Sequence, residues 1–358
     1  MQKMILISLL VAFSLQGAEL KFCLDGDSRT APGVKKFSNS IRQVPGHFGK
    51  ALLFERRTVN SFIPSEVILK GGATLKGKNN HLVMPAGSCA TLPLTAVRPK
   101  SSNTLSFRYK GAGKIAISFN REEVASFEAD AEYKTAVVVI VPEDDSGTLR
   151  IRTEKAVELD QVMLDKGIGY ANTYHAPGKM RDVDQVTVAP AVFSPDSGAV
   201  SCWIKAPWLR SDAQKATSIA LCAAQMPSGK GIKPLYICFW SNGVHLFVPG
   251  SGTKSLVCSC LLKELPESTD GWYHFVFNWK RENENMKLSI IVNGDKVFTT
   301  SGVSKDRPQY ENFNIGFVNG AYLNGMLDDF GLFSEPLSLN DAKQIYKSKL
   351  PLQRLFPR

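Results

Sequence analysis

The chain has 358 residues, of which 44% are hydrophobic and 21% are charged, and its formal net charge is +10. This composition is that of a globular protein with enough apolar residues for a core, and the length suggests two domains. After the N-terminus, the sequence has no segment with the length and apolarity of a membrane span. No block of Lys and Arg with interleaved aromatic residues occurs, so we expect no nucleic-acid partner.

The first 18 residues have the pattern of an export signal. Lys3 supplies a positive charge, residues 4–15 form an apolar run, and Gly17 and Ala18 are small. We predict a signal peptide at residues 1–18 and a periplasmic, cell-surface or secreted location; a buried N-terminal strand is the alternative. Cleavage removes one lysine and no acid, which leaves a net charge of +10 − 1 = +9. That charge suits anionic glycans, surface polymers or lipid headgroups, and plain solubility also explains it.

The cysteines do not form a disulfide scaffold. An odd number cannot pair completely within one chain, and the spacing is too sparse for a stapled fold. A bridge between Cys222 and Cys238 is conceivable. Cys258 and Cys260 should share one face of a strand, but no second close pair completes a zinc site. The seven residues are Cys23, Cys89, Cys202, Cys222, Cys238, Cys258 and Cys260.

The part of the chain that follows the signal opens with a short segment and a first sandwich. Residues 19–60 contain an Asp-bearing strand, a Gly/Pro-rich loop and the strand 50–54. Residues 61–168 alternate apolar and polar side chains between turn clusters, as antiparallel strands do. We predict a β-sandwich there, and its last strand resembles that of carbohydrate-binding-module jelly rolls. Residues 169–185, with Arg181 and Asp184, resemble the linker between such a jelly roll and a laminin-G-like domain.

Residues 186–348 carry the main pattern, and residues 349–358 form a tail. Short apolar strands broken by Gly and Asn indicate an antiparallel sandwich. Residues 198–205 resemble the laminin-G-like pattern "G-x-(V/I)-S-x-W-(I/V)-K", and residues 271–347 resemble the C-terminal half of a concanavalin A-like jelly roll. The expected fold is all-β, with two antiparallel β-sandwich (jelly-roll) domains.

The resemblance also bears on the N-terminal segment, since such domains open with an Asp-containing strand and a "G-x-A-L-x-F" strand. We favour residues 19–60 as the first strands of the laminin-G-like domain, with residues 61–168 inserted into it. The alternative is that residues 19–60 belong to the first sandwich.

Three local patterns predict details of the main sandwich. Tyr273, Phe275, Phe277 and Trp279 should form one apolar row, because alternate strand residues share a face. Asn293-Gly294 is typical of a type I′ hairpin turn. Ser338 and Asp341 predict a capped helix through Tyr346. The face of that helix should consist of Leu339, Ala342, Ile345 and Tyr346.

Catalytic chemistry is not favoured by the sequence. Retaining glycoside hydrolysis needs two carboxyl groups about 5 Å apart. Adjacent strand residues point to opposite faces, so Asp328 and Asp329 should not pair as acid and nucleophile. His274 should pack or form a hydrogen bond rather than catalyse. No nucleophile elbow or phosphate loop occurs.

The remaining chemistry is that of binding. Calcium is a possible cofactor, with Asp25 and Asp27 as candidate ligands, although turn formation also explains both residues. Loop aromatics can stack on sugar rings while amides bond hydroxyls. We expect an exported, non-enzymatic protein that recognises glycan or a surface polymer. The alternatives are a structural or adhesion protein that contacts surface proteins, and a glycoside hydrolase of the same superfold. The candidate ligand-binding residues are Trp208, Trp240, Asn242 and Tyr322.

Overall fold

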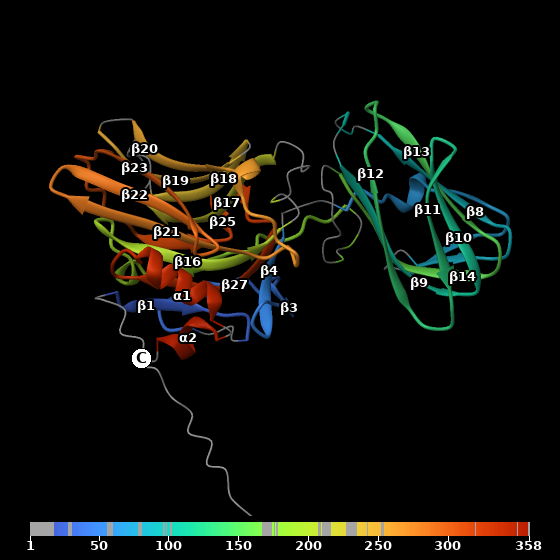
Figure 1. Ribbon diagram of the computed structural model, residues 1–358. Helices are drawn as coiled ribbons and strands as arrows, with labels where there is room; N and C mark the ends of the chain where they lie inside the picture. Colours follow the sequence, from blue (N-terminus) through green and yellow to red (C-terminus); the bar gives the residue numbers. More distant parts are fainter. Residues whose placement is uncertain are drawn as a thin grey trace, which may run out of the picture. The chain divides into compact units, whose positions relative to one another are not determined.

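The protein is all-β and divides into two compact units (Figure 1). Unit 1 comprises the chain up to Phe54 and from Gln185, and unit 2 comprises Glu55–Asp184. Unit 2 is therefore inserted between strands of unit 1. The computed structural model describes residues 18–27, 31–55, 60–77, 81–95, 97, 99–100, 102–166, 174, 176, 178–206, 209, 216–226, 235–241, 243–251, 254–318, 320–348 and 350–356.

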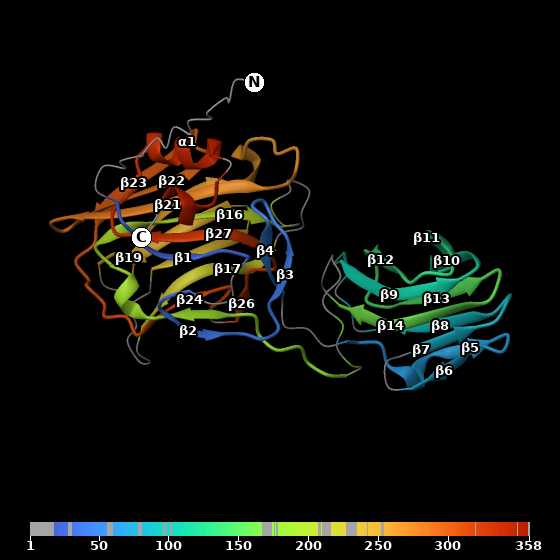
Figure 2. The same cartoon turned by 90° about the horizontal axis from the view of Figure 1, so that it is seen from below.

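Within the described residues, unit 1 is a sandwich of an eight-stranded and a seven-stranded antiparallel sheet (Figure 2). The eight-stranded sheet has the order β23 (Lys296–Val303), β22 (Asn285–Val292), β21 (Tyr273–Glu282), β16 (Ser197–Lys205), β27 (Gly325–Phe333), β4 (Lys50–Phe54) and β3 (Arg42–Pro45), with β1 (Leu20–Leu24) also on β27. The seven-stranded sheet has the order β2 (Val34–Phe37), β15 (Val186–Val188), β24 (Asn312–Ile315), β17 (Ala216–Gln225), β18 (Tyr236–Ser241), β19 (Gly243–Pro249) and β20 (Ser255–Leu261).

Short elements complete unit 1. A small hairpin is formed by β25 (Phe317–Val318) and β26 (Ala321–Tyr322). The helices α1 (Leu339–Lys347) and α2 (Leu352–Leu355) lie on the outer side of the eight-stranded sheet (Figure 1). Single 3-10 turns occur at η2 (Pro190–Val192) and η4 (Leu262–Glu264).

Both ends of the chain build the eight-stranded sheet. Leu24 lies opposite Phe330 in the β1–β27 pair, and Leu52 lies opposite Leu327 in the β4–β27 pair. At the C-terminus, Leu352 of α2 is fully buried in a cluster with Leu20. The segment predicted as a tail at 349–358 therefore contributes to the packing of unit 1.

The core of unit 1 forms as the strand pattern predicts. Phe275, Phe277 and Trp279 are buried between the sheets, and Tyr273 packs against the same cluster. Gly198 of the neighbouring strand β16 makes this possible, since a Cβ there would stand 2.5 Å from the Trp279 indole. The close packing of Trp279 therefore explains why a glycine stands at position 198 in the laminin-G-like strand pattern.

The predicted turn at Asn293-Gly294 forms, and the helix predicted to follow Ser338 forms as α1. Asn293 and Gly294 both have positive φ, and Asp295 N donates to Val292 O at 3.1 Å. In α1, Ser338 Oγ accepts from Asp341 N at 3.1 Å, which is the expected cap.

The expected apolar face of α1 is only half correct. Ala342 and Ile345 are buried, but Leu339 is 46% exposed and Tyr346 36% exposed. A nine-residue helix at the edge of a sheet buries a narrow stripe, so the flanking positions stay in water.

Unit 2 is a second sandwich with its own core. The residue pattern alternates along its strands, as in β12, where every second side chain is buried. Among the described residues one sheet has the order β11 (Glu122–Ala129), β10 (Gly113–Phe119), β13 (Gly147–Thr153), β8 (Cys89–Leu94) and β5 (Ile68–Lys70). The other has the order β12 (Lys134–Ile140), β9 (Asn103–Gly111), β14 (Val157–Asp165), β7 (His81–Met84) and β6 (Thr74–Lys76); η1 (Pro64–Glu66) precedes β5.

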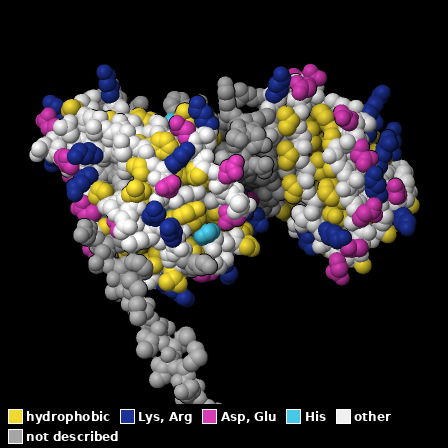
Figure 3. All heavy atoms as spheres, in the orientation of Figure 1, with side chains coloured by type: hydrophobic (Ala, Val, Ile, Leu, Met, Phe, Trp, Pro, Cys, Tyr) yellow, Lys and Arg dark blue, Asp and Glu magenta, His cyan; other side chains and the backbone are white. Residues whose placement is uncertain are grey.

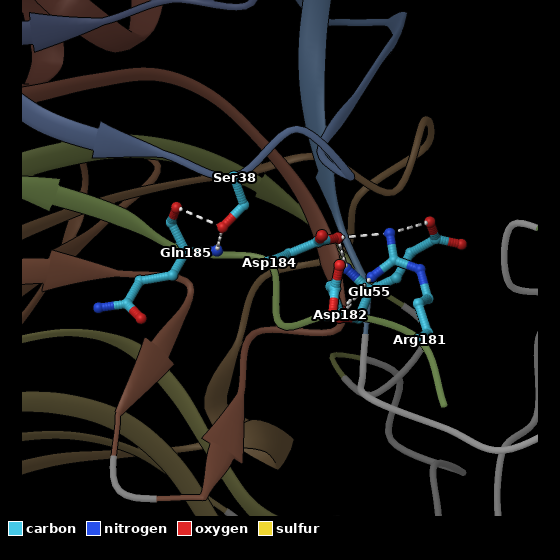
Figure 4. Close-up of polar contacts among 6 residues, drawn as sticks. All are labelled: Ser38, Glu55, Arg181, Asp182, Asp184 and Gln185. Atoms are coloured by element: carbon cyan, nitrogen blue, oxygen red, sulfur yellow. Dashed lines mark hydrogen bonds and ion pairs between the residues drawn. The ribbon is translucent and has the colours of Figure 1, made fainter. Parts of the chain in front are cut away.

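A buried ion-pair network lies where the chain enters and leaves unit 2 (Figure 4). Arg181 Nη2 donates to Glu55 Oε2 at 2.9 Å and to Asp184 Oδ2 at 2.8 Å. Asp184 Oδ2 also accepts from Glu55 N at 2.8 Å. All three side chains are at most 5% exposed. The Arg and Asp of the linker-like segment therefore hold the first and last residues of unit 2 together.

The cysteines are all free thiols. The suggested bridge between Cys222 and Cys238 is wrong, because Cys222 faces the core while Cys238 lies opposite His245 on the outer face. Cys258 and Cys260 share the core face of β20, as predicted. Burial raises the pKa of the Cys238 thiol to about 12.

In the described part of the chain, the helices are too short and polar to cross a membrane.

Candidate functional site

The outer face of the seven-stranded sheet carries a row of aromatic side chains. Tyr236 lies opposite Phe247, and Cys238 lies opposite His245. The alternate residues of these strands, such as Ile237 and Leu246, are buried in the core. Tyr236, His245 and Phe247 therefore point outward, and each is partly exposed.

The aromatic rings contact one another along the strands. The ring centroids of Tyr236 and Phe247 are 6.2 Å apart, and those of His245 and Phe247 are 5.8 Å apart. His245 Nδ1 is 2.8 Å from Ser259 Oγ on the next strand. Such contacts fix the rings in one surface. We call Tyr236, His245 and Phe247 the aromatic platform.

The β25–β26 hairpin stands beside this platform. Its Phe317 and Tyr322 rings are 4.9 Å apart and both are partly exposed. Val318 and Ala321 pack on alanines of β17 in a cluster that Tyr236 also contacts. The hairpin thus adds a second aromatic pair next to the platform.

Polar side chains continue the platform toward β15. Asn314 and Thr187 are opposite each other, and Asn314 is also opposite Ala223, whose next neighbour is Tyr236. Asn314 Nδ2 donates to Gln225 Oε1 at 2.9 Å. Asn314 Oδ1 has no hydrogen-bond partner among the described residues. Asn314 is buried, so the exposed part of this face consists of the aromatic rings and the partly exposed Thr187.

The predicted ligand-binding residues are only partly located. Tyr322 is part of the hairpin pair described above. Trp240 is in β18, opposite Gly243, but its side chain lies outside the described residues. Trp208 and Asn242 also lie outside them. These assignments stay predictions.

Sequence reasoning missed Tyr236, His245 and Phe247. Their alternation with buried residues is visible in the sequence and shows that they share a face. It does not show which face of the strand meets the second sheet and which stays open. The prediction of loop aromatics therefore did not include these strand residues.

On the outer face of the eight-stranded sheet, Trp203 is buried, in contrast to the residues of the aromatic platform. Trp203 is 4% exposed and lies between His47, whose ring centroid is 3.7 Å away, and Tyr346, at 5.5 Å. His47 comes from the β3–β4 loop and Tyr346 from α1. Trp203 is thus a packing residue under a loop and a helix.

A bulge interrupts the regular alternation that was assumed for the two adjacent aspartates of β27. Trp203 lies opposite Asp328 and Ser201 opposite Gly331, so a bulge falls between them, and Asp329 has a φ of +49°. The carboxylates therefore do not alternate as in a regular strand. Asp328 Oδ2 accepts from Phe48 N at 2.8 Å.

Asp329 serves the neighbouring helix. It accepts from Leu352 N of α2 at 2.8 and 2.9 Å. Burial raises the pKa of Asp329 to about 8 and that of Asp328 to about 6, and nearby Asp25 adds to both. Their backbone partners show that these carboxylates position a loop and a helix.

His274 is a buried, hydrogen-bonded residue. Its Nε2 is 2.9 Å from Ser201 Oγ. Burial lowers the pKa of His274 to about 3, so the ring is neutral at physiological pH.

Within the described residues, the structure does not complete a metal site around the candidate calcium ligands. Asp25 is half-buried after β1, and Asp27 is exposed. No group of three or more His, Cys, Asp or Glu side chains among the described residues is placed to hold a metal ion. Calcium stays a prediction without an assembled site.

A different exposed feature lies on unit 2. Val137, Val139 and Val141 are 44%, 45% and 49% exposed, and hydrophobic side chains form a band over β12 in Figure 3. In the described part of the sheet, β12 pairs on one side with β9 and is the last strand of the order. An exposed apolar edge strand is a common site for pairing with another chain.

Residues 181–343 match the family described as the Concanavalin A-like lectin/glucanases superfamily. Together with the sandwich described above, this shows that the chain contains a domain of that superfamily, as the laminin-G-like resemblance predicted. The family includes lectins and glucanases by its name, so the match does not decide between binding and hydrolysis. No curated protein is significantly similar to the chain.

Solved structures are similar in part. They include the "Botulinum Neurotoxin Type G Receptor Binding Domain", with a TM-score of 0.36, 14% identity, and coverage of 47% of this chain and 40% of that chain. The binding domain of botulinum neurotoxin DC in complex with rat synaptotagmin II has a TM-score of 0.36, 13% identity, and coverage of 47% and 41%. The chain thus spans less than half of each, and at these scores the similarity carries no argument about function.

Proposed function

We propose that the protein is an exported, non-catalytic binding protein that recognises a glycan through the aromatic platform of unit 1. The observation that carries the proposal is the row of partly exposed Tyr236, His245 and Phe247 on the outer face of the seven-stranded sheet. A sugar ring has an apolar C–H face, and an exposed aromatic ring offers a flat apolar partner for it.

The neighbouring groups suit the polar edge of a sugar. Ser259 is exposed beside His245, and Thr187 is partly exposed in the row that leads to Tyr236. Hydroxyl groups of a sugar can donate to the hydroxyl oxygens of these residues and accept from their hydroxyl groups. Tyr322 and Phe317 would border the bound chain at the hairpin.

The role proposed is binding, because the carboxylates best placed for hydrolysis have other partners. Asp328 accepts from a backbone N–H of the β3–β4 loop and Asp329 from one of α2. They lie on the eight-stranded sheet, whereas the aromatic platform is on the other sheet. A general acid or base must reach the bond that it acts on.

A glycan-array screen of residues 19–358, with and without calcium, tests the proposal. We expect selective binding that Phe247→Ala and Tyr236→Ala each weaken by about tenfold or more, because stacking on the platform is lost. The matched control is Tyr133→Ala, which removes a partly exposed aromatic ring from unit 2. It should leave binding unchanged.

Two results would reject this assignment. Binding that survives in both platform variants would place the glycan elsewhere, and absence of binding to every glycan would favour a protein partner. Release of reducing sugar from a bound glycan would reject the non-catalytic role.

Export is tested separately by N-terminal sequencing of the secreted chain, which should begin at Glu19.

The second candidate function is adhesion through protein contacts. The exposed valines of β12 favour it, because an extended strand of another protein can pair with this edge and cover them. Val139→Lys should then abolish the adhesion or self-association of the chain while the platform variants keep it. The reverse pattern would support the glycan assignment.

A further inference from the structure

A row of basic and hydroxyl side chains crosses the outer face of the eight-stranded sheet. In the strand registers, Ser197 lies opposite Lys280, Lys280 opposite Lys287, and Lys287 opposite Ser301. Residues directly opposite each other in an antiparallel sheet share a face. The row therefore presents two ammonium groups side by side, flanked by two hydroxyls.

This arrangement is unfavourable without a partner for the charges. Like charges directly opposite across two strands destabilise a sheet. Each lysine has one acidic partner: Lys280 Nζ is 3.4 Å from Glu335 Oε2, which also accepts from Ser197 Oγ at 2.7 Å, and Lys287 Nζ is 2.7 Å from Glu282 Oε2. All four charged side chains are at least 43% exposed, so these ion pairs are weak and readily exchanged.

Lys280, Lys287 and Ser301 of this row line a groove with a volume of about 600 Å³. The next row of side chains contributes Asn278, Ser289 and Thr299, which lie opposite one another on the same three strands. The side-chain amide of Asn278 already has hydrogen-bond partners, since it bonds Ser289 Oγ and the backbone of Leu337. Thr299 and Ser301 are exposed and line the groove.

We propose that this groove is a second binding site, which takes an acid group of an anionic polysaccharide between Lys280 and Lys287. The acid group would neutralise both ammonium groups, and the hydroxyls of Thr299 and Ser301 would bond the sugar hydroxyls next to it. The site shares no side chain with the aromatic platform, so it does not depend on the proposed function.

The hydroxyls favour an acidic glycan over a lone anion. A free sulfate or phosphate needs only the two ammonium groups, and it would leave Thr299, Ser301 and most of the groove unused. A chain of sugars fills the length of the groove across β21, β22 and β23. Inorganic sulfate should therefore bind far more weakly than a sulfated chain.

The test measures binding of residues 19–358 to heparin, polygalacturonate and neutral dextran, and to inorganic sulfate, at low and high salt. The double variant Lys280→Gln with Lys287→Gln should weaken heparin binding by at least about tenfold, since two charge-assisted contacts are lost. It should also flatten the salt dependence. Thr299→Glu, which places a carboxylate in the groove, should weaken binding to a similar degree.

The matched control is the double variant Lys114→Gln with Lys134→Gln. It removes the same charge from ion-paired lysines of unit 2, whose side chains are 35% and 46% exposed. It should change heparin binding by no more than about twofold. Equal losses in both double variants would assign binding to net charge and overturn the site.

Three further results decide the proposal. Unchanged heparin binding in Lys280→Gln with Lys287→Gln would overturn it, as would equal affinity for heparin and inorganic sulfate. Phe247→Ala should leave heparin binding intact in the presence of dextran. A loss of heparin binding in Phe247→Ala would indicate that acidic glycans bind at the aromatic platform. That result would overturn the proposed groove site and leave the proposed function unaffected.

Discussion

The two outer faces of unit 1 use aromatic residues in opposite ways. On the eight-stranded sheet, Trp203 is 4% exposed and is covered by a loop histidine and by Tyr346 of α1. On the seven-stranded sheet, Phe247 and Tyr236 are partly exposed, and no helix among the described residues lies over them. Aromatic residues are covered on one face and partly exposed on the other, where we propose that they bind a ligand.

Charged residues divide in the same way between units. Arg181 is buried between Glu55 and Asp184, whereas Lys280 and Lys287 are exposed and only loosely paired. Burial makes a charge pair expensive to break, and exposure leaves it free to exchange partners. Burial, rather than residue type, therefore separates structural groups from candidate binding groups. Four measurements test this distinction.

The largest effect is expected at Arg181. Arg181→Met removes the guanidinium and leaves Glu55 and Asp184 buried without it, so the free energy of unfolding of unit 2 should fall by about 3–5 kcal/mol. Urea unfolding followed by circular dichroism measures this. The control is Arg108→Met, whose Asp160 partner is 3.8 Å away and whose side chain is 42% exposed. A control loss as large as that of Arg181→Met would contradict the role of burial.

The second test compares two aromatic deletions. Trp203→Ala leaves a cavity under His47 and Tyr346 and should cost roughly 3 kcal/mol of unfolding free energy, which is typical of a buried aromatic. Phe247→Ala should cost about 1 kcal/mol or less, because its ring is partly in water already. Thermal melts of both variants measure the difference. Similar costs would mean that the platform is a packing surface.

Some features of the structure can be predicted from the sequence and others cannot. The aromatic row of β21, the Asn293-Gly294 turn and the Ser338 cap follow from local periodicity and turn chemistry, and all three form. Local patterns suffice there because each feature involves neighbours in the chain.

The candidate site could not be derived in that way. Which face of β19 is covered depends on β21 and β22 across the sandwich, far away in the chain. The Lys280–Lys287 row likewise depends on a strand register, and a slip of one residue would place both lysines on the other face. The bulge at Asp329 breaks the alternation that the sequence argument assumed.

The third test uses pH and concerns the covered face. Burial raises the pKa of Asp329 from 3.8 to about 8, so the folded protein binds more protons than the unfolded chain between these values. Stability should therefore fall as pH rises through this window, and the loss should be complete above about pH 8.

Asp329→Asn removes this titration, so its unfolding free energy should fall less between pH 5 and pH 8, on the order of a few kcal/mol less. Urea unfolding at several pH values measures it. Asp341→Asn, at the exposed helix cap, serves as the control and should parallel the wild type. A parallel curve for Asp329→Asn would show that Asp329 is solvated.

The smallest stability effect is expected at the lysine row. Lys287→Gln breaks an exposed pair with Glu282, worth at most about 1 kcal/mol, and also relieves the repulsion from Lys280. These two terms have opposite signs, so the unfolding free energy should change by less than about 0.5 kcal/mol. Because salt screens repulsion between exposed charges, any gain should be largest at low ionic strength. Chemical unfolding at low and high salt measures this, and a loss above about 1 kcal/mol at either salt would make Lys287 a structural residue like Arg181.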